Sequence, residues 1–163
     1  SLTFSESLWN VYFDAEPGEG YDKHLVLDPN VVYTGGIGIY EGTVLIDGNG
    51  AVIDLQDGLG IWVTAEEGQE VILDVRYTTI MNGHDYGIYY AGYSEGSIRN
   101  CNFINDNMGV KLLDNSNVMI KNCNFINNEQ YGVAIVSEIP VCNVSYCNGW
   151  NNGEEDYMEN CPG

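Results

Sequence analysis

Basic residues are scarce in this sequence. Its 163 residues include 5 Lys and Arg against 24 Asp and Glu, which gives a formal net charge of −19 at pH 7. Nucleic acids and anionic membrane surfaces are both bound through clusters of cationic side chains. The composition therefore excludes nucleic acid as a partner and disfavours such membranes. It favours a secreted or salt-adapted acidic protein, or a protein that binds cations such as calcium.

Long apolar segments are also missing. No run approaches the roughly 18 apolar residues of a membrane-spanning helix, so we expect no membrane span. Residues 1–4 (SLTF) lack the basic start and the extended apolar stretch of a signal peptide. The chain is therefore expected to begin after a cleaved signal or inside a longer protein.

Paired metal ligands are absent as well. The five cysteines form no CxxC motif, and His24 and His84 stand far apart in the sequence. A structural zinc site needs about four such ligands, so no metal centre is predicted. Because five is an odd number, at least one cysteine is unpaired or pairs with another chain.

What the sequence does contain is a repeat. Residues 98–106 (IRNCNFIND) return 22 positions later as residues 120–128 (IKNCNFINN). Five short segments align on a glycine, and successive glycines are 22, 27, 22 and 23 residues apart. These glycines are Gly38, Gly60, Gly87, Gly109 and Gly132. A repeat of about this length is the signature of a solenoid.

Each repeat carries three short apolar segments with no helical stretch between them, which is the pattern of a parallel β-helix. We predict an all-β fold of about five or six coils over residues 34–152. Residues 1–33 are predicted to form an irregular N-terminal capping segment, and residues 153–163 a C-terminal tail. This organisation amounts to one structural domain.

Alternation within the first segment of each coil predicts the direction of its side chains. The predicted inward residues are Ile37, Ile39, Leu59, Ile61, Ile88, Met108, Val110, Leu112, Val133 and Ile135. The predicted outward residues, two positions after each glycine, are Tyr40, Trp62, Tyr89, Lys111 and Ala134.

Two stretches carry a family resemblance. Residues 44–54 (VLIDGNGAVID) and 120–125 (IKNCNF) resemble repeats of the right-handed parallel β-helices in the pectate-lyase-like and NosD-like superfamily. The resemblance covers about residues 34–152 and implies a right-handed coil. It identifies no activity, because the superfamily includes lyases, hydrolases, epimerases and adhesins.

The catalytic motifs of the pectin hydrolases in that superfamily are incomplete here. Gly83-His84-Asp85 departs from Gly-His-Gly, and neither Asp-Asp nor Arg-x-Lys occurs. Calcium-dependent lyases of the superfamily use an acidic cluster with an Arg or Lys base, and Lys111 is the base best placed for that role. A polysaccharide lyase or glycoside hydrolase acting on acidic polysaccharide is therefore an alternative interpretation.

Two columns of identical side chains are predicted along the solenoid. The cysteine column is Cys101, Cys123 and Cys147, and the asparagine column is Asn105, Asn127 and Asn151. The thiols are expected to be buried as small apolar groups, and the amides to satisfy backbone groups at turns. Near the C-terminal end, Cys142 and Cys161 would form a disulfide in an oxidising compartment.

The outward aromatic residues are the candidate binding surface. Tyr40, Trp62 and Tyr89 are predicted to form an exposed column that Lys111 continues. Flat aromatic rings suit the apolar faces of sugars. The carboxylates expected beside the column belong to Asp57, Asp85 and Asp114. The alternative is that the rings only stabilise neighbouring strands.

We therefore expect a secreted or cell-surface module that binds polysaccharide through this column. No cofactor is predicted, with calcium as the one ion that the acidic residues would suit. A second interpretation is a structural subunit that self-associates end to end into an extracellular filament, through the solenoid ends or the N-terminal segment.

Overall fold

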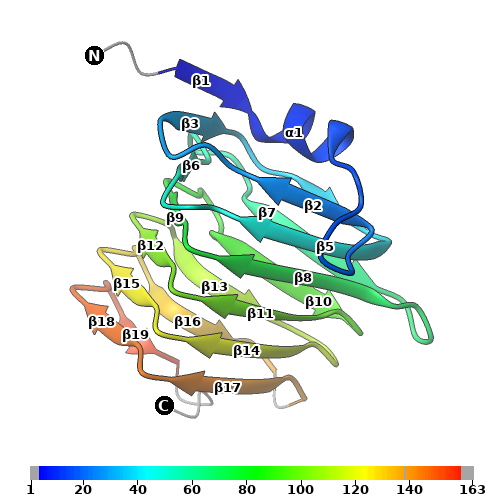
Figure 1. Cartoon of the computed structure of the whole chain (residues 1–163). Helices are drawn as coiled ribbons and strands as arrows, with labels where there is room; N and C mark the ends of the chain where they lie inside the picture. The colour runs from blue at the N-terminus through cyan, green and yellow to red at the C-terminus, as the bar shows by residue number, and fades with distance from the viewer. Residues whose placement is uncertain (1–3, 138, 159–163) are drawn as a thin grey trace.

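Three parallel β-sheets form the walls of a solenoid. The computed structural model describes residues 4–137 and 139–158, and its strands lie one above another along the axis (Figure 1). One sheet has seven strands and the other two have six each, which corresponds to about seven turns, slightly more than the repeat predicted. All pairings between the strands are parallel. The prediction of an all-β parallel β-helix is confirmed.

Each coil contributes one strand to each sheet in a fixed order. Sheet 1 contains β4 (Gly38–Ile39), β7 (Ile61–Ala65), β10 (Ile88–Gly92), β13 (Met108–Leu112), β16 (Tyr131–Ile135) and β19 (Glu155–Tyr157). Sheet 2 contains β2 (Lys23–Val26), β5 (Gly42–Asp47), β8 (Val71–Arg76), β11 (Glu95–Arg99), β14 (Asn117–Lys121) and β17 (Val141–Ser145). Sheet 3 contains β1 (Phe4–Ser7), β3 (Val31–Thr34), β6 (Val52–Asp54), β9 (Thr79–Met81), β12 (Asn102–Ile104), β15 (Asn124–Ile126) and β18 (Asn148–Trp150).

The inward side chains of the three sheets fill the space between them. In β8 the side chains alternate strictly between buried and half-buried positions, as the period of a strand requires. Equivalent residues stack along the axis, as the rings of Phe103 and Phe125 do at a centroid distance of 5.2 Å. Each fully buried Ile, Leu or Val contributes roughly 1.5 to 3 kcal/mol through the removal of apolar surface from water. The core between the described strands is thus a continuous apolar column.

One of the predicted side-chain directions is wrong, and one outward residue is not exposed. Leu59 was predicted to point inward but is 61 % exposed, because Gly60, with φ at +110°, reverses the chain just before β7 begins. Ala134 does lie on the outward face, since it pairs with Lys111, but it is fully buried there. It lies on β16 between β13 and β19, whose longer side chains cover a single methyl group.

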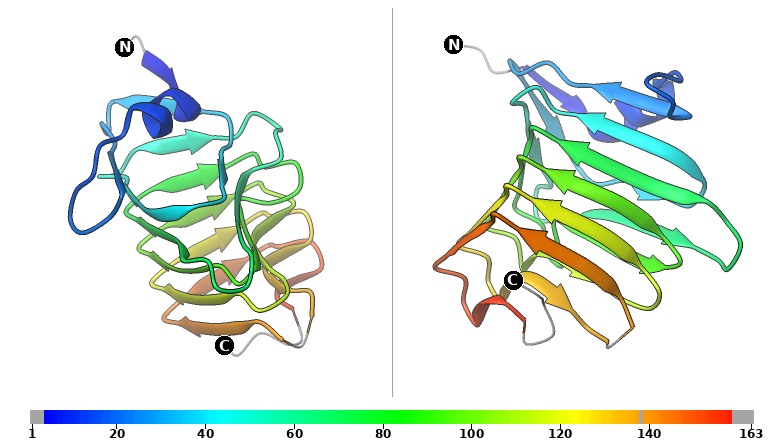
Figure 2. Two further views of the ribbon diagram at one scale, coloured as in Figure 1. Left: turned by 90° about the vertical axis from the view of Figure 1, so that its right-hand side faces the viewer. Right: turned by 60° about the horizontal axis from the view of Figure 1, so that its bottom comes forward.

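The sheets extend beyond the predicted coil boundaries at both ends. Within the predicted capping segment, β2 and β3 already pair with β5 and β6, and β19 pairs with β16 after residue 152. The helix α1 (Leu8–Asp14) lies over the N-terminal end (Figure 2). In this helix Leu8 is fully buried and Tyr12 packs against the core. The strand β1 pairs with β3 of the same chain. In the described part of the chain, no helix has the length and apolarity to cross a membrane.

The asparagine column forms the corner where sheet 3 passes into sheet 1. Asn105, Asn127 and Asn151 follow their strands directly, and each adopts a left-handed backbone with φ between 55° and 58°. Asparagine tolerates this conformation better than most residues, which explains why it occupies each of these corner positions. The amide of Asn151 also donates to the side-chain oxygen of Asn127 at 2.8 Å.

A second polar ladder lies one residue further on and inside the corner. Its members, Asp106, Asn128 and Asn152, each accept a backbone N–H from the preceding coil through their Oδ1 atoms. The donors are Gly83 to Asp106 at 2.7 Å, Asp106 to Asn128 at 3.0 Å and Asn128 to Asn152 at 3.0 Å. The ladder therefore satisfies the buried N–H groups that the turns leave without strand partners.

Asp106 is the one carboxyl group in this ladder. The amide nitrogens of Asn128 and Asn152 donate to the carbonyls of Phe103 and Phe125, at 3.4 Å and 3.0 Å. The corresponding Oδ2 atom of Asp106 is buried and has no hydrogen-bond partner among the described residues. Burial raises the pKa of Asp106 to about 8, because an ionised carboxylate loses its hydration there. Asp106 therefore keeps its proton to a higher pH than an exposed carboxyl group does.

We predict that Asp106→Asn stabilises the protein most at alkaline pH. The folded-state pKa of Asp106 is raised above its ordinary value of 3.8, so its stabilising contribution is complete below pH 4 and is lost as the pH rises through about 8. The full loss is on the order of 5 kcal/mol for a shift of this size. Urea unfolding at pH 4 and pH 9 should show that the free energy of unfolding of the variant exceeds that of wild type mainly at pH 9.

The matched control is Asp57→Asn, which removes a carboxylate whose side chain is 86 % exposed. It should leave the pH dependence of the unfolding free energy unchanged. An equal gain for Asp106→Asn at both pH values would contradict a protonated Asp106.

Candidate functional site

An aromatic column runs along the outer face of sheet 1. Trp62, Tyr89 and Lys111 are direct neighbours on β7, β10 and β13. The Trp62 and Tyr89 rings lie 6.2 Å apart at an interplanar angle of 20°, and the Lys111 ammonium lies 5.2 Å from the Tyr89 ring centroid. The Tyr40 ring meets Trp62 edge-on at 5.9 Å and 73°. The structure thus brings together the four outward residues selected from the sequence, with Tyr40 and Trp62 exposed by 54 % and 39 %.

Tyr40 reaches the column from an unexpected register. In β4 it is Gly38, and not Tyr40, that pairs with Trp62. The Tyr40 ring folds back over Gly38, where a Cβ atom would lie only 2.5 Å from the tyrosine hydroxyl. The missing side chain at Gly38 is therefore what allows Tyr40 to join the column.

A pocket opens at the N-terminal end of this column. We call it the aromatic pocket: its walls are Trp9, Tyr40, Trp62 and Tyr86, and its cavity is about 330 Å³. The remaining lining residues are Gly36, Ile37, Gly38, Leu59 and Gly60. Sequence analysis missed Trp9 because it belongs to α1, outside the repeat. It also did not select Tyr86, although an aromatic residue next to an aligned glycine was a usable signal.

Carboxylates surround the column without lining the aromatic pocket. Burial, and next the charge of Asp85, raise the pKa of Tyr86 to about 12. Burial, followed by the charge of Asp114, also raises the pKa of Tyr89. Asp85 and Asp114 therefore lie close enough to the rings to impose a negative potential on them.

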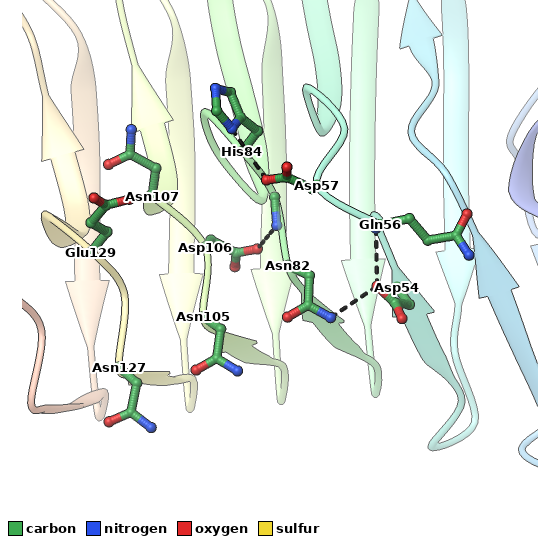
Figure 3. A pocket seen from close by; sticks show the side chains of 11 residues that line it. Asp54, Gln56, Asp57, Asn82, His84, Asn105, Asp106, Asn107, Asn127 and Glu129 are labelled. Atoms are coloured by element: carbon green, nitrogen blue, oxygen red, sulfur yellow. Dashed lines mark hydrogen bonds and ion pairs between the residues drawn. The ribbon is translucent and has the colours of Figure 1, made fainter.

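The third predicted carboxylate, Asp57, lies instead in a separate polar groove along the corner between sheets 3 and 1 (Figure 3). This carboxylate groove has a volume of about 490 Å³ and is lined mainly by Asp, Glu, Asn and His side chains. Its carboxyl groups belong to Asp54, Asp57, Asp106 and Glu129. Asp57 and His84 form an ion pair at 3.2 Å, which is solvent-exposed and therefore weak.

The carboxylate groove and the aromatic pocket share one corner of the coil. Asp57 and Leu59 are two residues apart, as are His84 and Tyr86, and each pair has one member in the groove and one in the pocket. Two residues of extended chain span about 7 Å at most. The groove and the pocket therefore adjoin at this corner.

The cysteine column lies in the apolar core and at its edge. Cys101 and Cys123 are buried in the core, and Cys147 is half-buried. The contact with Cys101 raises the pKa of Cys123 to about 12, whereas the hydrogen bond with Cys123 lowers the pKa of Cys101. Cys142 is buried on β17 and Cys161 lies outside the described residues, so the disulfide between them stays a prediction.

One cluster elsewhere brings potential metal ligands together. Within the described ranges, only Glu19, His24 and Asp47 place three ligand atoms within 4.8 Å of one another. The guanidinium of Arg76 already contacts both carboxylates, at 3.0 Å and 2.7 Å. The positive charge of Arg76 already neutralises the two carboxylates, as a metal cation would. These residues therefore do not fit a metal. Calcium binding by the acidic residues stays a prediction.

Comparison with known proteins identifies the fold family. No curated protein and no solved structure matches the chain. A family model described as a right-handed β-helix region matches residues 28–161, which is most of the chain. This match agrees with the three stacked sheets and with the handedness that the resemblance implied. The chain therefore belongs to the right-handed β-helix family.

Proposed function

We propose that this protein is a secreted or cell-surface β-helix module that binds polysaccharide along sheet 1. The observation that supports the proposal is the continuous aromatic surface formed by Tyr40, Trp62 and Tyr89 together with the aromatic pocket. Aromatic rings at a protein surface supply apolar area together with a polar edge, which suits the mixed character of a sugar. An exposed apolar patch of this kind usually marks an interaction site.

The polar groups around the rings support the same ligand class. The carboxylates beside the column and in the carboxylate groove are hydrogen-bond acceptors for sugar hydroxyls, and Lys111 is a donor at the far end. Solenoids present such groups at regular intervals, because each coil repeats the last. An extended polymer that lies along the axis would therefore meet several equivalent contacts.

We predict that Trp62→Ala combined with Tyr89→Ala abolishes polysaccharide retention. Each ring should contribute about 1 to 2 kcal/mol, so the double variant should bind roughly a hundredfold more weakly. A glycan array followed by affinity electrophoresis on the retained polysaccharide would measure the loss.

The matched control is Trp150→Ala, which removes a tryptophan that is 73 % exposed on β18 at the opposite end of the solenoid. Circular dichroism should show all the variants folded. Undiminished retention by the double variant would reject the column as the binding surface.

Glycoside hydrolysis is the second candidate, and it is supported by Asp106. A general acid must carry a proton near neutral pH, and the raised pKa of Asp106 meets that requirement in a groove with further carboxylates. Its free oxygen is covered, so the reaction would require the corner to open on binding.

We predict that, if the protein is a hydrolase, it releases reducing ends from its polysaccharide and that Asp106→Asn stops this release. The assay should include acidic and neutral polysaccharides, with and without calcium. The variant must be folded and must still retain the polysaccharide. Equal release by wild type and variant would exclude Asp106 as the acid.

A further inference from the structure

We infer that the aromatic pocket binds a methylated ammonium group, such as the trimethylammonium group of choline. The inference rests on the surface assigned above to polysaccharide and adds a charged group to the ligand. It concerns the N-terminal end of the aromatic column, where Trp9 and Tyr86 join Tyr40 and Trp62.

The geometry of the walls carries the first part of the argument. Four aromatic side chains line one cavity, and two of them, Tyr40 and Trp62, stand nearly perpendicular at 73°. Perpendicular rings enclose a corner in which a compact cation meets more than one aromatic side chain. Aromatic cages of this kind recognise quaternary ammonium groups, because the ring quadrupole attracts positive charge.

The chemistry of the lining selects the kind of cation. Beside the rings, the pocket is lined by glycine, isoleucine and leucine, and no carboxylate or amide side chain belongs to it. A primary ammonium is strongly hydrated and needs hydrogen-bond acceptors to replace its water. A trimethylammonium group donates no hydrogen bonds and has an apolar surface. The lining therefore favours the methylated group over a primary ammonium.

The electrostatics of the surroundings favour positive charge. The chain carries a net charge of −19, and Asp85 raises the pKa of the Tyr86 hydroxyl beside the pocket. A strongly negative surface raises the local concentration of cations and their association rate. An anionic ligand group would meet repulsion at the same place.

The protein itself shows a cation on the same column. The Lys111 ammonium lies 5.2 Å from the Tyr89 ring centroid at the C-terminal end. Lys23 contacts Tyr12 in the same way, also at 5.2 Å. At the N-terminal end the described residues place no lysine or arginine in the lining of the pocket. The ring surfaces there are thus available to a cation from outside.

Titration with small probes tests the inference on the intact chain. Choline, its neutral isostere 3,3-dimethylbutanol and the primary amine ethanolamine should be added separately, with tryptophan fluorescence and calorimetry as readouts. Choline should bind about tenfold more tightly than either of the other two, and added salt should weaken it. Equal binding of choline and its neutral isostere would overturn the inference, and so would no detectable binding of choline.

Variants locate the site and separate this inference from polysaccharide binding. Trp9→Ala and Trp62→Ala should each weaken choline binding roughly 3- to 30-fold, whereas Trp150→Ala should leave it unchanged. Loss of choline binding in the Trp150 variant alone would place the site elsewhere and reject the pocket. Glycan retention without choline binding would leave the proposed function standing and refute the cage. Choline binding without glycan retention would refute the proposed polysaccharide binding and leave the cage standing.

Discussion

The hydrogen-bonded stacking of one coil on the next is the constraint on which the whole structure depends. Parallel strands in register place each side chain about 4.8 Å from its equivalent in the next coil. Every position therefore has to be compatible with a copy of itself above and below. Stacked phenylalanines, amide ladders and left-handed asparagine corners all meet that condition. The aromatic column on sheet 1 is a consequence of the same rule applied to an outward position.

This constraint explains which features were predictable from the sequence. Repeated spacing was enough to infer the coils, the strand order and the neighbours Trp62, Tyr89 and Lys111, because register propagates from coil to coil. The same reasoning could not place residues in the parts of the chain that do not repeat. Trp9 reaches the aromatic pocket from α1, which belongs to no repeat. Leu59 was misplaced because a single turn glycine breaks the alternation on which side-chain directions depend.

Asp106 is the position at which the inner polar ladder departs from its repeated asparagine. An asparagine would complete the inner ladder, yet the chain places there a carboxyl group whose second oxygen is buried without a partner. Departures from the locally best residue tend to concentrate at functional sites. Asp106 also lines the carboxylate groove, which adjoins the aromatic pocket. The groove and the pocket are thus better regarded as one extended surface than as two unrelated features.

The position of Trp9 has a consequence for the end of the solenoid. Terminal elements of a repeat protein have a neighbour on one side only and are therefore the first to fray. Because Trp9 lies on α1 and also forms a wall of the pocket, occupancy of the pocket and docking of the helix are thermodynamically linked. The free energy that a ligand gains by contacting Trp9 therefore also stabilises α1 in its docked position. A filled pocket would thereby hold α1 in place over the exposed end of the solenoid.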